Sequence, residues 1–204
     1  MQSNNNEDNP QHWQVLAERE IFKLDPWMQI FVQDIRLPNG RKVDNYGRID
    51  LPDYSCVFAQ VPDGRVIVEK QYQHGVGRVS LVLPAGTIEQ GEEPLVAAQR
   101  ELLEETGYQS DQWKSLGSFF CHGNYGCGSA HFFFAQDCRL VVEPDSGDLE
   151  DMEIMLLSEQ ELLKALGQGD IALVGTAALI GLVQLARSGF LPGIDSEFQP
   201  VVAS

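Results

Sequence analysis

The first half of the chain is made of short runs rich in apolar residues, several of them alternating with polar residues, and separated by turn-forming residues. Runs of this kind, bounded by Gly, Pro, Asn and Asp, predict β-strands. We expect strands at residues 14–24, 27–36, 54–61, 65–72 and 79–83. A further short strand is expected after the turn at 37–40, and the turn at 62–64 joins two of the strands in a hairpin.

The second half mixes helices with strands. Residues 94–106 contain good helix formers, start with Pro94 at a position suited to the first helical turn, and stop before Gly107, which suits a left-handed cap. The glycine-rich segment 123–129 is expected to be a loop. We expect further strands at 113–122, 130–136 and 154–157, and helices at 159–166, capped by Ser158, and at 176–188.

Three glutamates share one side of the first predicted helix. At about 100° per residue, Glu101, Glu104 and Glu105 fall within an arc of roughly 100°, while the aliphatic residues project to another side. Like charges at these spacings repel, which is unfavourable for an isolated helix. A divalent cation such as Mg²⁺, which prefers oxygen ligands, would reverse that repulsion. The alternative is an acidic helix face that is only solvated.

The acidic helix belongs to a longer pattern over residues 86–108, GTIEQGEEPLVAAQRELLEETGY. It resembles the Nudix box of hydrolases that act on nucleoside diphosphates linked to another group, except that Tyr108 stands where an aliphatic residue is usual. The N-terminal strands and the segment 83–86, Leu-Pro-Ala-Gly, make it most similar to the ADP-ribose pyrophosphatase group. The matching positions are Gly86, Glu92, Arg100, Glu101, Leu102, Glu104, Glu105 and Gly107.

This resemblance implies an α+β fold, the Nudix α/β/α sandwich, with a mixed central sheet and a small N-terminal β subdomain. We expect a disordered tail at residues 1–12, the N-terminal β subdomain at 13–50, the Nudix hydrolase domain at 51–190 and a C-terminal tail at 191–204.

The resemblance also implies a Mg²⁺-dependent hydrolase, with Mn²⁺ as an alternative ion. A bound cation neutralises phosphate oxygens and lowers the pKa of a bound water, so that the water attacks one phosphorus near neutral pH. Members of the group often draw a catalytic base from an acidic loop, and the comparable loop here is 147–153. The residues implied are Ala85 (through its carbonyl), Glu101, Glu104 and Glu105 for the metal, Arg100 and Glu92 as supports, and Glu150 as the base, with Glu153 in reserve. For the loop itself, a solvated acidic turn is the alternative.

Substrate recognition departs from the ADP-ribose pattern at two positions. Gln73 stands where an arginine that contacts the nucleobase is common, and Gly123 stands where a proline is usual. We expect ADP-ribose, cleaved to AMP and ribose 5-phosphate, or a related nucleotide sugar, with Gln73 close to it. A GDP-sugar, a dinucleotide or a non-catalytic ligand-binding role stay open. The N-terminal strands imply a homodimer, in which Trp27 either stacks on a base or belongs to a core or interface.

The composition of this 204-residue chain argues against nucleic acid and membranes as its partners. A formal net charge of −16 argues against binding to the nucleic acid backbone, which requires clustered Lys and Arg. No apolar stretch approaches the roughly 20 residues that cross a bilayer. The polar start MQSNNNEDNPQHW lacks the pattern of a signal peptide, so we expect a cytoplasmic protein with no membrane partner.

Overall fold

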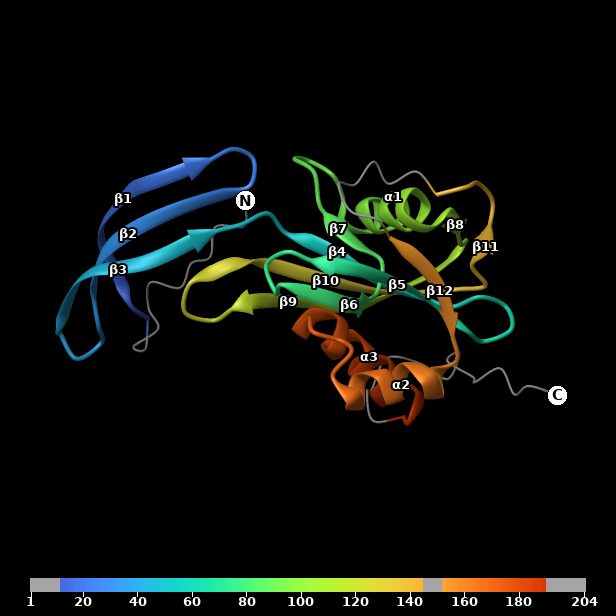
Figure 1. Cartoon of the computed structure of the whole chain (residues 1–204). Helices are drawn as coiled ribbons and strands as arrows, with labels where there is room; N and C mark the ends of the chain where they lie inside the picture. Colours follow the sequence, from blue (N-terminus) through green and yellow to red (C-terminus); the bar gives the residue numbers. More distant parts are fainter. Residues whose placement is uncertain (1–11, 145–151, 190–204) are drawn as a thin grey trace. The chain divides into compact units, whose positions relative to one another are not determined.

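The structure is a computed structural model that describes residues 12–144 and 152–189 (Figure 1). Almost all of the two predicted tails therefore lies outside the described residues. The chain divides into two compact units. One unit comprises the residues up to Pro52 together with Phe120–Ser129, and the other comprises Asp53–Phe119 and the residues from Ala130 onward. Within the described ranges, no helix combines the length and the apolar character needed to cross a membrane.

The first unit is an antiparallel meander of three strands, β1 (Gln14–Leu24), β2 (Met28–Arg36) and β3 (Lys42–Asp50). Gly40, in the left-handed region at φ 83°, closes the turn between β2 and β3 by donating its N–H to the Leu37 carbonyl at 2.9 Å. The third strand is nine residues long and thus longer than the short strand expected from the sequence. Every residue of β1 is exposed.

The second unit is built on two sheets of mixed and antiparallel pairing. In the main sheet β10 (Gly126–Gln136) lies between β9 (Gln112–His122) and β4 (Tyr54–Ala59), and β4 also pairs with the short β7 (Ala85–Thr87). The pairing of β10 with β4 is parallel and that of β4 with β7 antiparallel. The second sheet has the order β12 (Glu153–Leu157), β5 (Val66–Gln73), β6 (Arg78–Val82), and a two-stranded ladder joins β8 (Tyr108–Gln109) to β11 (Arg139–Leu140).

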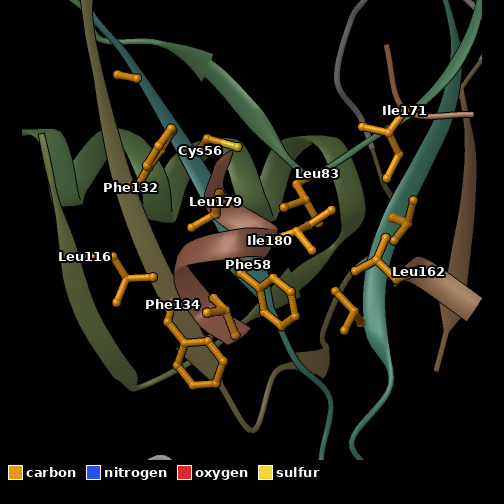
Figure 2. Packing of buried hydrophobic residues seen from close by; sticks show 14 of the residues in the cluster. Cys56, Phe58, Leu83, Leu116, Phe132, Phe134, Leu162, Ile171, Leu179 and Ile180 are labelled. Atoms are coloured by element: carbon orange, nitrogen blue, oxygen red, sulfur yellow. The ribbon is translucent and has the colours of Figure 1, made fainter. Parts of the chain in front are cut away.

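Helices cover both faces of these sheets. Figure 1 shows α1 (Pro94–Thr106) on one side and α2 (Glu159–Gln168) and α3 (Val174–Arg187) on the other. Strand β4 is buried from Ser55 onward, and from Cys56 its apolar residues alternate between two cores. Phe58 belongs to the core that contains Phe134, Leu179 and Ile180 (Figure 2), whereas Val57 belongs to a second core with residues of α1. The α/β/α sandwich follows from this alternation.

Most of the predicted helices and strands are present, and the glycine-rich segment is the main error. Residues 126–129 were expected to be a loop, but they form the start of β10. Gly128 is required there because it has φ 72° and because a Cβ would lie 2.7 Å from the Pro52 carbonyl oxygen. Gly126 pairs with Ile49 in parallel. The glycines thus permit close approach of two backbones, a long-range contact that local sequence does not reveal.

Candidate active site

Helix α1 buries its middle residues, whereas Leu95 and Val96 in its first turn are exposed. Glu101 and Glu105 lie beside the neighbouring strand β7. Ala97, Ala98 and Leu102 are buried, the latter two in the core that contains Val57. Gly107, at φ 74°, ends the helix by donating its N–H to the Leu103 carbonyl at 2.8 Å. Because α1 contacts both β4 and β7, its acidic side borders the residues that immediately precede it in sequence.

Glu105 is the most deeply placed acid of the predicted metal set. Its side chain belongs to a residue only 8% exposed, and one carboxylate oxygen accepts a hydrogen bond from the Ala85 N–H at 3.0 Å. The carboxylate of Glu105 is therefore held against the backbone of Ala85, the residue whose carbonyl is a predicted metal ligand.

Gly86 leaves room for the second carboxylate. A Cβ placed on Gly86 would lie 2.0 Å from the carboxyl carbon of Glu101, which no real contact allows. The glycine is therefore needed for space, and its backbone conformation is one that other residues can adopt. Without a side chain here, the Glu101 carboxylate lies directly against β7.

Arg100 connects the other acids of the site. Its Nη1 donates to Glu101 at 2.7 Å and to Glu104 at 3.3 Å. Its Nε and Nη2 donate to the two oxygens of Glu92, both at 3.0 Å, and Nη2 also donates to the Thr87 carbonyl at 3.0 Å. A guanidinium with this bidentate geometry fixes a carboxylate more strongly than a single hydrogen bond would. The structure thus joins Arg100, a residue of α1 itself, to Glu92, which precedes the helix.

The ion pair shifts the titration of both partners. Hydrogen bonds from Arg100, and then one from the Glu89 N–H, hold the pKa of Glu92 below its ordinary value of 4.5. The same hydrogen bonds to Glu92, supported by those to Glu101, raise the pKa of Arg100. Both groups therefore stay charged at neutral pH and form a permanent pair.

The donor set of the site suits a hard divalent cation. Glu101, Glu104 and Glu105 offer carboxylate oxygens, and β7 offers backbone carbonyls, which are the ligands that Mg²⁺ and Mn²⁺ prefer. In the described part of the chain, no three Asp, Glu, His or Cys side chains are arranged to hold an ion. Instead, Arg100 donates hydrogen bonds to Glu101 and Glu104, and Glu105 accepts one from the Ala85 N–H.

A cavity of about 650 Å³ opens beside this site. Glu105, Ala85 and Gly86 line it together with residues of β4, β5 and the start of α3. Gln73, predicted to lie near the substrate, is one of the lining residues. The remaining lining residues are Tyr54, Cys56, Gln71, Val82, Leu83, Thr87, Leu173, Val174, Gly175 and Thr176.

Three other residues predicted to belong to the site are not among the described residues that line the cavity. Trp27 follows β1 in the first unit and is 61% exposed. Glu150, the predicted base, lies outside the described residues. Glu153 starts β12, where it pairs with Lys70 at 3.0 Å on the surface.

Most of the cavity wall was not predicted from the sequence. Gln71 and Gln73 are two residues apart on β5, so that strand alternation places them on one face, a signal that the sequence did contain. Gly175 and Thr176 begin an apolar helix, and nothing in their local sequence indicates that they border a site. They reach the cavity through the packing of α3 against the core.

Comparison with known proteins identifies the family. The model of the NUDIX domain matches residues 51–174, more than half of the chain. The chain belongs to the Nudix family. The model of the nucleoside diphosphate sugar hydrolase N-terminal domain matches residues 13–49. The protein is therefore a Nudix hydrolase, and the family predicted from residues 86–108 is confirmed.

Several relatives support this assignment. The chain is 29% identical to the ADP-ribose pyrophosphatase of Bacillus subtilis over 174 residues, which cover 85% of this chain and 93% of the relative. It is 35% identical to the ADP-sugar pyrophosphatase of Mus musculus over 50% of this chain and 49% of the relative. A crystal structure of an ADP compounds hydrolase, at 20% identity, superposes with a TM-score of 0.77 and covers 88% of this chain and 96% of that one. The expected α+β Nudix sandwich is confirmed.

Proposed function

We propose that this Nudix hydrolase uses Mg²⁺, with Mn²⁺ as an alternative, to cleave the pyrophosphate bond of ADP-ribose or a related nucleotide sugar. The observation that carries the proposal is the position of Glu105, Ala85 and Gly86, which line a cavity of about 650 Å³ next to the acidic side of α1. A cavity of this size accommodates a nucleotide-sized ligand. ADP-ribose pyrophosphatase is also the name of a relative that matches most of the chain.

The residues that would hold the metal are Glu101, Glu104, Glu105 and the carbonyl of Ala85. A bound cation supplies charge neutralisation at the phosphates and a water of lowered pKa. The chain itself keeps these carboxylates in place through Gly86 and Arg100.

In the reaction, the oxygen of water bonds to one phosphorus and the bridging oxygen leaves with the other phosphate. With ADP-ribose, the products are AMP and ribose 5-phosphate. Arg100 and Glu92 are supports that touch no reacting atom, and we assign the removal of the water proton to Glu150, in the acidic loop 147–153. Replacement of Glu150 by Gln tests this assignment, because a base that is lost lowers kcat while the affinity for substrate is kept.

The absence of an arginine at position 73 leaves the nucleobase preference open. Gln73 lines the cavity at the position where the ADP-ribose group commonly has an arginine. A neutral amide both donates and accepts hydrogen bonds, which leaves a GDP-sugar or a dinucleotide as a second candidate substrate.

We also propose a homodimer. The first unit exposes several apolar side chains along β1 and in the turn that follows it, and exposed apolar surface suits a contact with a second copy of the chain. These residues are Val15, Ile21, Phe22, Leu24 and Trp27, all more than 45% exposed. A monomeric mass by light scattering at micromolar concentration would contradict the dimer.

The decisive experiment incubates purified protein with Mg²⁺ and a panel of ADP-ribose, ADP-sugars, GDP-sugars and dinucleotides. We expect AMP release from ADP-ribose, and its abolition by excess EDTA. The proposed function would be contradicted if none of the compounds in the panel is hydrolysed.

Replacement of Glu105 by Gln separates the metal site from the fold. Because the amide keeps the shape but loses the charge, we expect kcat/KM to fall by about 100-fold or more with the melting temperature nearly unchanged. Glu143, exposed in the loop after β11, provides the matched control, and Glu143→Gln should retain wild-type rates. Near wild-type activity of Glu105→Gln would remove Glu105 from the metal set.

A further inference from the structure

The wall of the cavity contributed by β5 presents two neutral amides. Gln71 and Gln73 lie on the same face of the strand and both line the cavity. Neither side chain makes a hydrogen bond to any other described residue. Each amide can donate and accept, so two polar groups without a protein partner face the space beside Glu105.

The first turn of α3 forms another part of the wall. Leu173, which precedes the helix, offers no side-chain cap, and the first helical backbone bond runs from the Ala177 N–H to the Leu173 carbonyl at 3.1 Å. The N–H groups of Val174, Gly175 and Thr176 come before that bond, and donors in a first turn have no acceptor within their own helix. The amino end of α3 therefore presents unused donors at the cavity.

Thr176 adds a second, independent feature to this turn. The residue is only 4% exposed, yet it lines the cavity, and its hydroxyl has no hydrogen-bond partner among the residues that the structure describes. Among the described residues, its oxygen is not one of the fully enclosed side-chain atoms that lack a partner, so it is open to the cavity. A hydroxyl at this place can donate a hydrogen bond to a ligand and accept one from it.

Gly175 allows Tyr54 of β4 to lie close to the first turn of α3. A Cβ on Gly175 would lie 2.4 Å from the hydroxyl oxygen of Tyr54. The absence of a side chain thus lets the Tyr54 hydroxyl approach the first turn of α3. Tyr54 also lines the cavity, so its ring adds an apolar surface next to the polar groups.

The charges of the wall decide what kind of ligand group fits. Among the described lining residues, Glu105 carries the only formal charge, and Lys, Arg and His are missing. Arg and Lys are the side chains that most often bind phosphate groups, although the N–H groups of a helix N-terminus also bind them. Amides, a threonine hydroxyl and helix N–H groups around a tyrosine ring instead match an uncharged group that carries several hydroxyls.

We propose that Gln71, Gln73, Thr176 and the first turn of α3 form a subsite for the hydroxyl groups of the sugar attached to the diphosphate. This inference rests on the proposed function, and it assigns the residues that select a nucleotide sugar over a nucleoside diphosphate with a simpler substituent. The sugar hydroxyls satisfy the Thr176 hydroxyl and the amides, while Glu105 remains with the diphosphate end.

The test compares two substrates that differ only in the group beyond the diphosphate, ADP-ribose and the methyl ester of ADP. The measured quantity is the ratio of kcat/KM for the two compounds. Thr176→Val removes the hydroxyl and keeps the shape, and Gln73→Met removes the amide. Each should lower the ratio by about 3- to 10-fold, the usual effect of one neutral hydrogen bond, mainly through KM for ADP-ribose.

Two further variants keep the result interpretable. Thr176→Ser retains the hydroxyl and should keep the wild-type ratio, and Gln168→Met, on an exposed residue of α2 away from the cavity wall, should do the same. Unchanged ratios in Thr176→Val and Gln73→Met would overturn the subsite, as would equal losses for both substrates, which would place the nucleoside here. A wild-type enzyme inactive on both compounds would instead count against the proposed function.

Discussion

Gly86 makes room for the Glu101 carboxylate, and we expect this space to matter for activity more than for stability. A Cβ on Gly86 would meet the far end of the Glu101 side chain, which can rotate away at small cost. Gly86→Ala should therefore lower kcat/KM by about 10- to 100-fold, because the displaced carboxylate no longer lies against β7 and Arg100. The melting temperature should change little, and steady-state kinetics with thermal unfolding on the same preparation checks both expectations.

A second glycine provides the control for this substitution. Gly167 lies in α2 with nothing within 4 Å of an added Cβ. Gly167→Ala should keep full activity and raise stability by roughly 0.5–1 kcal/mol, the helix preference of Ala over Gly. Full activity of Gly86→Ala would mean that the Glu101 carboxylate need not contact β7.

The ion pair of Glu92 with Arg100 predicts a pH dependence of stability. Because the folded-state pKa of Glu92 is lowered from 4.5, the pair contributes its full stability above pH 4.5 and loses it as the pH falls through the lower folded value. The unfolding free energy of wild type should exceed that of Glu92→Gln at pH 7, and the difference should shrink below pH 4.5. Urea denaturation from pH 7 to pH 3 measures it, and a constant difference would contradict the assignment.

At the scale of elements, the start of α2 is stabilised by a capping box that can be recognised in the sequence. Ser158 accepts the Glu161 N–H while the Glu161 carboxylate accepts the Ser158 N–H, a complete capping box. Ser158→Ala should cost about 1 kcal/mol of unfolding free energy, measured by chemical denaturation. Ser158→Thr, which keeps the acceptor oxygen, should lose less, and equal losses would show that the hydroxyl does not cap.

The elements that could be predicted are those whose ends are marked by local residues. Helix α1 was placed correctly because Pro94 and Gly107 mark its ends locally. Strand β7 was not expected, because its three residues form a strand only by pairing with β4. The acidic side of α1 was evident from spacing, whereas the cavity joins β5 to the start of α3, which are distant in sequence. Local chemistry was therefore predictable, and the partners brought in by tertiary packing were not.

At the scale of the whole molecule, the excess of acids should make stability depend on salt. With 30 Asp and Glu against 14 Lys and Arg, the folded chain concentrates negative charge that the unfolded chain spreads out. Raising the ionic strength from 0.01 to 0.15 M shortens the Debye length from about 30 to about 8 Å. The melting temperature should then rise by about 2–4 °C, which corresponds to about 1 kcal/mol for a domain of this size.

The salt effect must be separated from ion binding at the acidic side of α1. Scanning calorimetry in NaCl and in KCl, both with EDTA, should give equal rises, because screening does not distinguish the two cations. Addition of Mg²⁺ at constant ionic strength should add a further rise that Glu105→Gln loses, since only that part depends on a bound cation. A melting temperature that falls with NaCl would show that attractive ion pairs, and not net repulsion, dominate the electrostatic energy of this molecule.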